Sequence, residues 1–72
     1  MDYVLDPKNI SEKLVNLRLK KNVSQTQVAE SLGITKAAIS QYESGQRIPS
    51  DEVKIKLSNY YGVTVQNLFY TV

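Results

Sequence analysis

The 72 residues carry a formal net charge of +2, and 42% of them are apolar. This length and composition are those of one small folded domain, which excludes a multidomain enzyme and a disordered chain. The absence of cysteine and histidine removes the commonest metal ligands and the commonest general base, so we expect no catalytic activity, no metal ion and no other cofactor. Because no apolar run is long enough to span a membrane and no secretory signal is evident, we expect a cytoplasmic protein.

Capping residues divide the chain into five expected helices. Asp6 followed by Pro7 is typical of a helix start, because aspartate accepts backbone N–H groups and proline suits the first helical position. Ser24 and Gln27 have the S-x-x-Q spacing of a capping box, which predicts a second start. Serine or threonine caps begin the other three helices. The sequence therefore predicts helices over residues 7–21, 25–32, 36–44, 51–61 and 65–69.

Basic residues gather in the first of these helices. The stretch 8–21 contains five basic residues and one acidic residue, which is a net charge of +4. This asymmetry is compatible with a polyanionic partner.

The second and third helices carry the most informative spacing. Ala29, Gly33 and Ile39 supply, in this order, a small residue, a residue that tolerates positive φ and an apolar residue. Two short helices that are joined by a tight turn and cross steeply need a small residue where they cross and a residue tolerant of positive φ in the turn. They also need an apolar residue that holds the second helix against the first. The spacing therefore predicts a helix-turn-helix.

The pattern as a whole resembles the phage repressor and Cro family of helix-turn-helix proteins, the XRE-type regulators. The resemblance covers about residues 8–69. It is carried by Ile10, Leu14, Leu17, Arg18, Ser24, Gln25, Ala29, Leu32, Gly33, Ile39, Tyr42, Glu43, Ser44, Gly45, Pro49, Ser50, Leu57, Gly62, Val63 and Thr64. It implies an all-α fold, a compact five-helix DNA-binding domain whose third helix enters the major groove. We expect one such domain over residues 1–72, with an N-terminal arm of residues 1–6 and a tail of residues 70–72.

The outward face of helix 36–44 is the expected base-reading surface. Ile39 and Tyr42 should face the core, which turns the polar residues of this helix outward. The predicted base-contacting residues are Lys36, Ala37, Ser40 and Gln41. Gln41 can pair with adenine, Lys36 can donate to guanine, and the Ala37 methyl can pack on thymine. The alternative is that this face is only solvated.

Phosphate contacts are expected at helix N-termini and in the loop after the third helix. The predicted residues are Ser24, Gln25, Thr35, Ser44, Gln46 and Arg47. For Gln25 the resemblance implies that the side chain grips a phosphate and braces the recognition helix. Simple capping by Ser24 and Thr35, and a free surface charge at Arg47, are the alternatives.

The resemblance also gives Arg18 and Glu43 a structural role. In this family the matching positions commonly form a partly buried ion pair between the first and third helices, which orients the recognition helix. The alternative is that they are two unrelated surface charges.

Two features depart from the family pattern. Lys54 stands where the family usually has an apolar residue, so we expect either a rotated apolar face on helix 51–61 or an ammonium that reaches the surface. Val15 and Leu19 form an apolar pair on a side of the first helix that the family usually leaves polar. They are expected to pack with residues 3–5, or else to form an exposed patch for a partner.

The resemblance implies a sequence-specific regulator of transcription that binds double-stranded DNA, and we expect a repressor. It also implies a homodimer on an inverted-repeat operator, and no small-molecule ligand is expected. The expected dimer interface consists of Val65, Leu68, Phe69, Tyr70 and Val72, although Leu68 and Phe69 could equally close the core. The alternative function is an antitoxin-like or accessory module that binds a protein, with secondary or no DNA binding.

Overall fold

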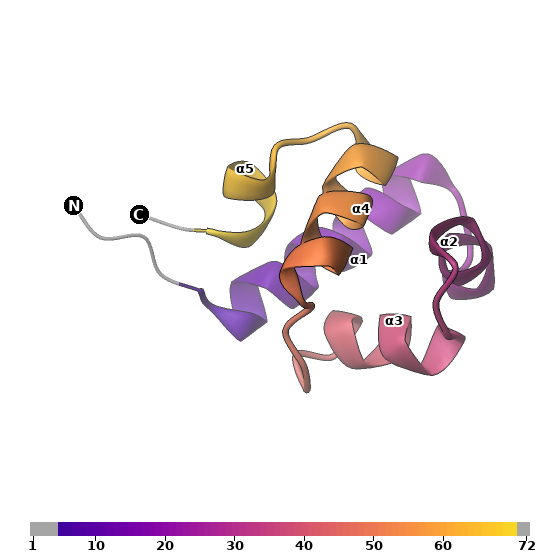
Figure 1. Ribbon diagram of the computed structural model, residues 1–72, viewed down its shortest axis with the longest axis horizontal. Coiled ribbons are helices and arrows are strands. Elements are labelled where there is room, and N and C mark those ends of the chain that lie inside the picture. The colour runs from indigo at the N-terminus through magenta and orange to yellow at the C-terminus, as the bar shows by residue number, and fades with distance from the viewer. Residues whose placement is uncertain (1–4, 71–72) are drawn as a thin grey trace.

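The computed structural model describes residues 5–70, which form five α-helices and no strand (Figure 1). The helices are α1 (Pro7–Lys21), α2 (Gln25–Leu32), α3 (Lys36–Glu43), α4 (Asp51–Tyr61) and α5 (Val65–Phe69). The predicted all-α fold is confirmed, and four of the helices have the expected ends. The exception is α3, because Ser44 is its C-cap: the Ser44 N–H still donates to Ser40, but Gly45 then turns the chain with a φ of 79°.

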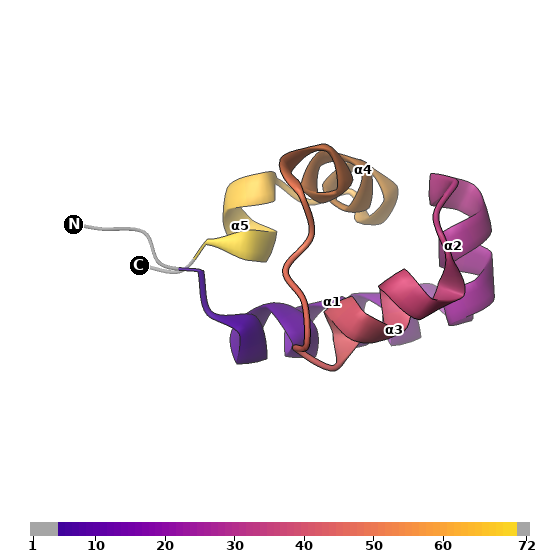
Figure 2. The ribbon, with the colours of Figure 1, turned by 60° about the horizontal axis from the view of Figure 1, so that its bottom comes forward.

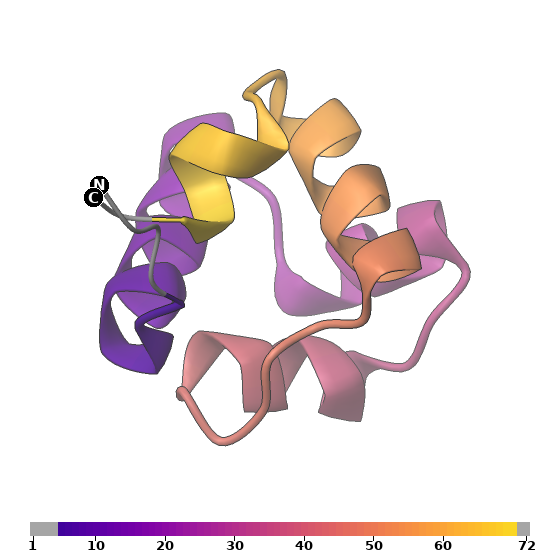
Figure 3. The ribbon, with the colours of Figure 1, turned by 60° about the vertical axis from the view of Figure 1, so that its left-hand side comes forward.

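The helices enclose one core. Figures 2 and 3 show α3 on the opposite side of this core from α4 and α5, with α1 running along the molecule, and Figure 2 places α2 and α5 at opposite ends. The buried apolar residues are Ile10, Leu14, Val28, Ala29, Leu32, Ala38, Ile39, Tyr42, Leu57, Leu68 and Phe69. Every helix therefore contributes to the core. Within residues 5–70, no helix is both long and apolar enough to cross a membrane.

The capping box at the start of α2 is present as predicted. The Ser24 hydroxyl accepts from the Gln27 N–H at 3.1 Å, and the Gln27 side-chain oxygen accepts from the Ser24 N–H at 2.7 Å. These two bonds satisfy donors that a helix start otherwise leaves without partners. The beginning of α2 is thus set by its own residues.

The turn between α2 and α3 depends on the positive φ of Gly33. Gly33 has a φ of 69°, and a Cβ added there would meet nothing within 4 Å. The requirement is therefore for positive φ and not for space. The turn is closed by the Ile34 N–H, which donates to the Ala29 carbonyl at 3.0 Å.

Lys54 lies inside the fold, and neither arrangement expected for it is found. The residue is 5% exposed and shares the buried face of α4 with Leu57 and Ser58. Its ammonium donates to the Tyr70 hydroxyl at 3.1 Å and lies 3.5 Å from the Asp51 carboxylate. Because a buried cation requires polar partners, these contacts let lysine occupy a place that is usually apolar.

The apolar pair on α1 is not covered as a unit. Leu19 is 62% exposed, whereas Val15 is partly buried. Leu5 is 36% exposed. Tyr3 and Val4, which were expected to cover the pair, lie outside the described residues. Leu19 is therefore an exposed apolar side chain on the described part of the surface.

Ser58→Ala is expected to stabilise the fold. Ser58 is 2% exposed, and its hydroxyl has no hydrogen-bond partner within residues 5–70. Because an unsatisfied buried hydroxyl costs about 1–3 kcal/mol, its removal should raise the free energy of unfolding by about 1 kcal/mol in a urea titration. Ser11→Ala is the matched control, because the buried Ser11 hydroxyl donates to the Lys8 carbonyl at 2.9 Å. That variant should be destabilised, and stabilisation in both would contradict this explanation.

Candidate nucleic-acid interface

The helix-turn-helix formed by α2 and α3 is the centre of the candidate site. Figure 1 looks nearly along α2 while α3 runs across the view, so the two helices cross steeply. Ala29, which is 3% exposed, supplies the small residue on α2. Ile39 and Tyr42 are 2% and 3% exposed, so the inner face of α3 is held in the core.

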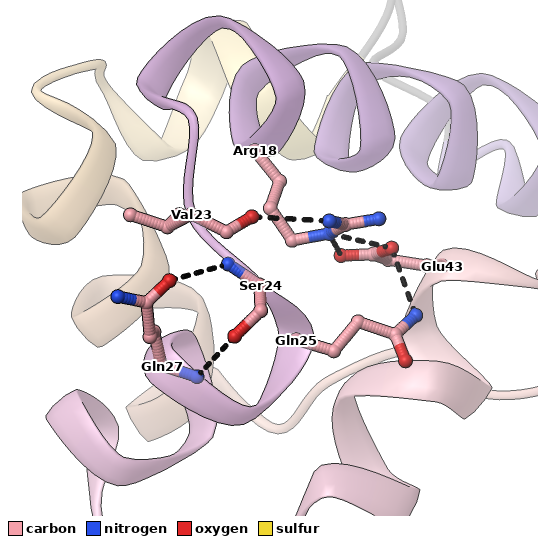
Figure 4. Close-up of polar contacts among 6 residues, drawn as sticks. All are labelled: Arg18, Val23, Ser24, Gln25, Gln27 and Glu43. Carbon is pink, nitrogen blue, oxygen red and sulfur yellow. Dashed lines mark hydrogen bonds and ion pairs between the residues drawn. The ribbon is translucent and has the colours of Figure 1, made fainter.

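Glu43 joins α3 to both preceding helices (Figure 4). Its carboxylate accepts from Arg18 Nε of α1, at 2.8 Å to Oε2 and 3.1 Å to Oε1. Its Oε1 also accepts from Gln25 Nε2, at the start of α2, at 3.1 Å. The structure thus brings together Arg18, Glu43 and Gln25, and the exposed fractions of the Arg18 and Glu43 side chains are 17% and 6%. This carboxylate fixes the end of α3 against α1 and α2.

The ion pair shifts the ionisation of its cation. The hydrogen bond to Glu43 raises the pKa of Arg18, although burial opposes the shift. Arg18 also donates from Nη1 to the Val23 carbonyl at 3.1 Å. The acceptor is a backbone oxygen, which every residue has, so the sequence pattern could not indicate this contact. It extends the network to the segment between α1 and α2.

The outer face of α3 presents the residues predicted to contact bases. Lys36, Ala37 and Ser40 are exposed, and Gln41 is partly buried. Gln41 Oε1 accepts from Arg47 Nη1 at 3.4 Å, a contact that the sequence analysis did not predict. The face therefore offers an ammonium, a methyl, a hydroxyl and an amide, which match the groups on major-groove base edges.

The predicted phosphate-contacting residues lie at three places. Ser24 and Gln25 are at the N-terminus of α2, and Thr35 caps α3 by accepting from the Ala38 N–H at 3.0 Å. The first N–H groups of a helix point outward without intrahelical partners and attract anions. The remaining three, in the segment that follows α3, are all exposed: Ser44, Gln46 and Arg47. Because Gln25 bonds Glu43, the start of α2 lies beside the end of α3, close to this segment.

The residues predicted for a dimer interface are divided by the structure. Leu68 and Phe69 are 1% and 0% exposed, so they belong to the core of the chain itself. Val65 and Tyr70 are partly buried against that core. Val72 lies outside the described residues.

Because of Tyr61, the stability of the fold is expected to fall at alkaline pH. Burial raises the pKa of Tyr61 to about 12, and the negative charge of Glu43 adds to the shift. Because the unfolded chain releases this proton near pH 10, stability is retained below about pH 10 and falls as the pH rises toward 12. Urea titrations at about pH 9 and 11 should therefore show a smaller loss for Tyr61→Phe than for the wild type. Equal losses would contradict this role.

Comparison with known proteins identifies the family. The helix-turn-helix family model matches residues 14–68, which is most of the chain. The chain therefore belongs to the helix-turn-helix family, and the resemblance inferred from the sequence is confirmed.

Relatives and solved structures agree with this assignment. The transcriptional activator BcrR of Enterococcus faecalis is 41% identical over 58 residues, which are 81% of this chain and 28% of BcrR. The CTXphi transcriptional repressor RstR of Vibrio cholerae is 34% identical over 58 residues, covering 81% of this chain and 52% of RstR. The chain thus spans about half the length of RstR and less of BcrR. The restriction-modification controller protein C.AhdI of Aeromonas hydrophila superimposes with a TM-score of 0.81 at 28% identity, over 89% of this chain and 97% of that chain.

Proposed function

We propose that this chain binds double-stranded DNA sequence-specifically and regulates transcription, with α3 in the major groove. The observation that carries the proposal is the contrast between the two sides of α3. Its outer side exposes Lys36, Ala37 and Ser40, whereas Glu43 ties the helix to α1 and α2. Base edges are read by side chains that a rigid scaffold holds in place, so a recognition helix needs both properties. The chain is proposed to act in the cytoplasm by binding DNA, without catalysing a reaction.

The proposed mode of regulation is repression by occupancy of a promoter. RstR is named a repressor and BcrR an activator, so membership of the family is compatible with either direction. A bound domain that covers a promoter blocks transcription without any further activity. Repression is therefore the simplest consequence of the proposed binding.

We also propose that two copies bind an inverted repeat. Symmetric dimers of this class place their recognition helices one DNA turn apart, which sets half-site centres about 10 base pairs apart. Val65 and Tyr70 are the interface residues that retain some exposure in the described chain. The interface is thus proposed at the α5 end of each copy.

Selection of bound duplexes from a random DNA pool, followed by sequencing, tests this function. We expect an inverted repeat with half-site centres about 10 base pairs apart. A folded protein that enriches no sequence would contradict the proposal and would favour the accessory protein-binding module. Circular dichroism of the same sample establishes that the protein is folded.

The salt dependence of binding should be modest. The segment 22–50, which contains α2, α3 and the following loop, has two basic residues, Lys36 and Arg47. Each neutralised phosphate contributes a slope of about −0.9 to log affinity against log salt. Because Lys36 is predicted to contact a base and Arg47 a phosphate, we expect a slope of about −1 per protomer. Lys36→Ala should leave this slope unchanged, because Lys36 is predicted to contact a base, whereas Arg47→Ala should reduce the slope by about 1. A wild-type slope near zero would contradict phosphate contact altogether.

A further inference from the structure

Arg47 contacts Gln41, which we propose reads bases. Arg47 Nη1 donates to Gln41 Oε1 at 3.4 Å, and the guanidinium carbon lies 5.5 Å from the centre of the Tyr42 ring. Tyr42 is 3% exposed, so this ring is a fixed surface over which the cation is held. One hydrogen bond and one cation–π contact therefore restrict the Arg47 side chain.

The loop after α3 brings Arg47 back over the helix. Gly45 turns the chain with a φ of 79°, and the Gln46 N–H then donates to the Gln41 carbonyl at 3.0 Å. This backbone bond closes the loop directly over the residue whose side chain Arg47 contacts. The pairing of Arg47 with Gln41 thus follows from the course of the backbone.

The direction of the hydrogen bond determines how the Gln41 amide is presented. A guanidinium has only donors, so the amide oxygen of Gln41 must face Arg47. A free glutamine amide can rotate by half a turn, which exchanges its donor and its acceptor. Base edges distinguish these two orientations, because adenine places the N7 acceptor beside the N6 donor in a fixed order. Since a carbonyl oxygen has two lone pairs, Oε1 can accept from Arg47 and from a base together.

We propose that Arg47 is a positioning residue that holds the Gln41 amide in one orientation and thereby narrows the base preference at the position that Gln41 reads. This inference rests on the proposed DNA-binding function. The other donors of the guanidinium are compatible with a phosphate contact as well. The two roles have different consequences: loss of a phosphate contact weakens binding to all sequences alike, whereas loss of positioning changes the preference at one base pair.

Random-pool selection with the wild type, Arg47→Ala, Gln41→Ala and the double variant separates these roles. At the base pair that Gln41 reads, the wild type should prefer one base pair over the others by about 5- to 150-fold. Arg47→Ala should lose most of that preference. In the Gln41→Ala background, Arg47→Ala should cause no further loss of preference. Lys20→Ala, which removes an exposed cation from α1, is the control and should keep the preference.

These selections test the positioning role of Arg47 separately from the proposed DNA-binding function. An unchanged base preference in Arg47→Ala, whatever its affinity, would overturn the positioning role and leave the proposed function intact. A wild type that enriches no sequence would overturn both.

A second measurement uses the free protein in solution. Nuclear relaxation of the Gln41 side-chain NH2 group should report restricted motion in the wild type. The restriction should be lost in Arg47→Ala, with motion similar to that of the exposed Gln46 side chain. Equal mobility of the Gln41 amide in the two proteins would overturn the inference.

Discussion

Glu43→Ala is expected to lower the free energy of unfolding by about 3–5 kcal/mol and to abolish specific DNA binding. The Glu43 carboxylate accepts from both Arg18 and Gln25, and its side chain is 6% exposed. Its removal leaves the Arg18 guanidinium without a counter-charge in a place where water reaches little of it. It also frees the end of α3 from α1 and α2. Urea titration measures the first effect, and titration of a selected duplex measures the second.

Glu30→Ala is the matched control for charge. Glu30 lies on the exposed side of α2, so its loss should change stability by no more than about 0.5 kcal/mol. Replacement of both Arg18 and Glu43 by apolar residues of similar size should recover much of the stability, because no charge is then left unpaired. A Glu43→Ala protein as stable as the wild type would contradict this prediction. It would show that water replaces the contacts that Arg18 makes with Glu43.

Gln41→Ala is expected to weaken binding to the preferred operator by about 1–3 kcal/mol and to remove the preference at one base pair of each half-site. The Gln41 amide holds a donor and an acceptor side by side, so it can form a bidentate pair with adenine N7 and N6. Alanine keeps the helix, so the fold should be little affected. Competition between operators that differ at one base pair measures the loss.

The control for this variant is Asn59→Ala, which removes an exposed amide from α4. It should leave both affinity and preference unchanged. A Gln41→Ala protein with wild-type preference at every base pair would show that the face of α3 is only solvated.

The ends of the helices could be predicted because the signals are local. Each cap is a side chain that accepts from a backbone N–H two or three residues later, as Asp6, Ser24 and Thr35 do. Such contacts depend on spacing within a few residues. The end of α3 was misplaced by one residue because Ser44 keeps one helical bond while the chain already turns at Gly45.

Contacts between distant residues were harder to predict. The burial of Lys54 depends on the Tyr70 hydroxyl 16 positions later, which no helical periodicity indicates. The bond between Arg47 and Gln41 depends on the path of a loop. The contact of Arg18 with Glu43 was anticipated through the family resemblance, because nothing in the spacing of two residues 25 positions apart shows that they meet.

In the proposed complex, α3 reads the major-groove edge of DNA through Gln41. A direct test replaces single adenines of the selected operator with 7-deaza analogues, which lack the N7 acceptor that faces the major groove. We expect one such replacement in each half-site to weaken binding of the wild type by about 1–3 kcal/mol, and to have no further effect on Gln41→Ala. If no replacement weakens binding of the wild type, α3 does not read this edge and the proposed mode of recognition is wrong.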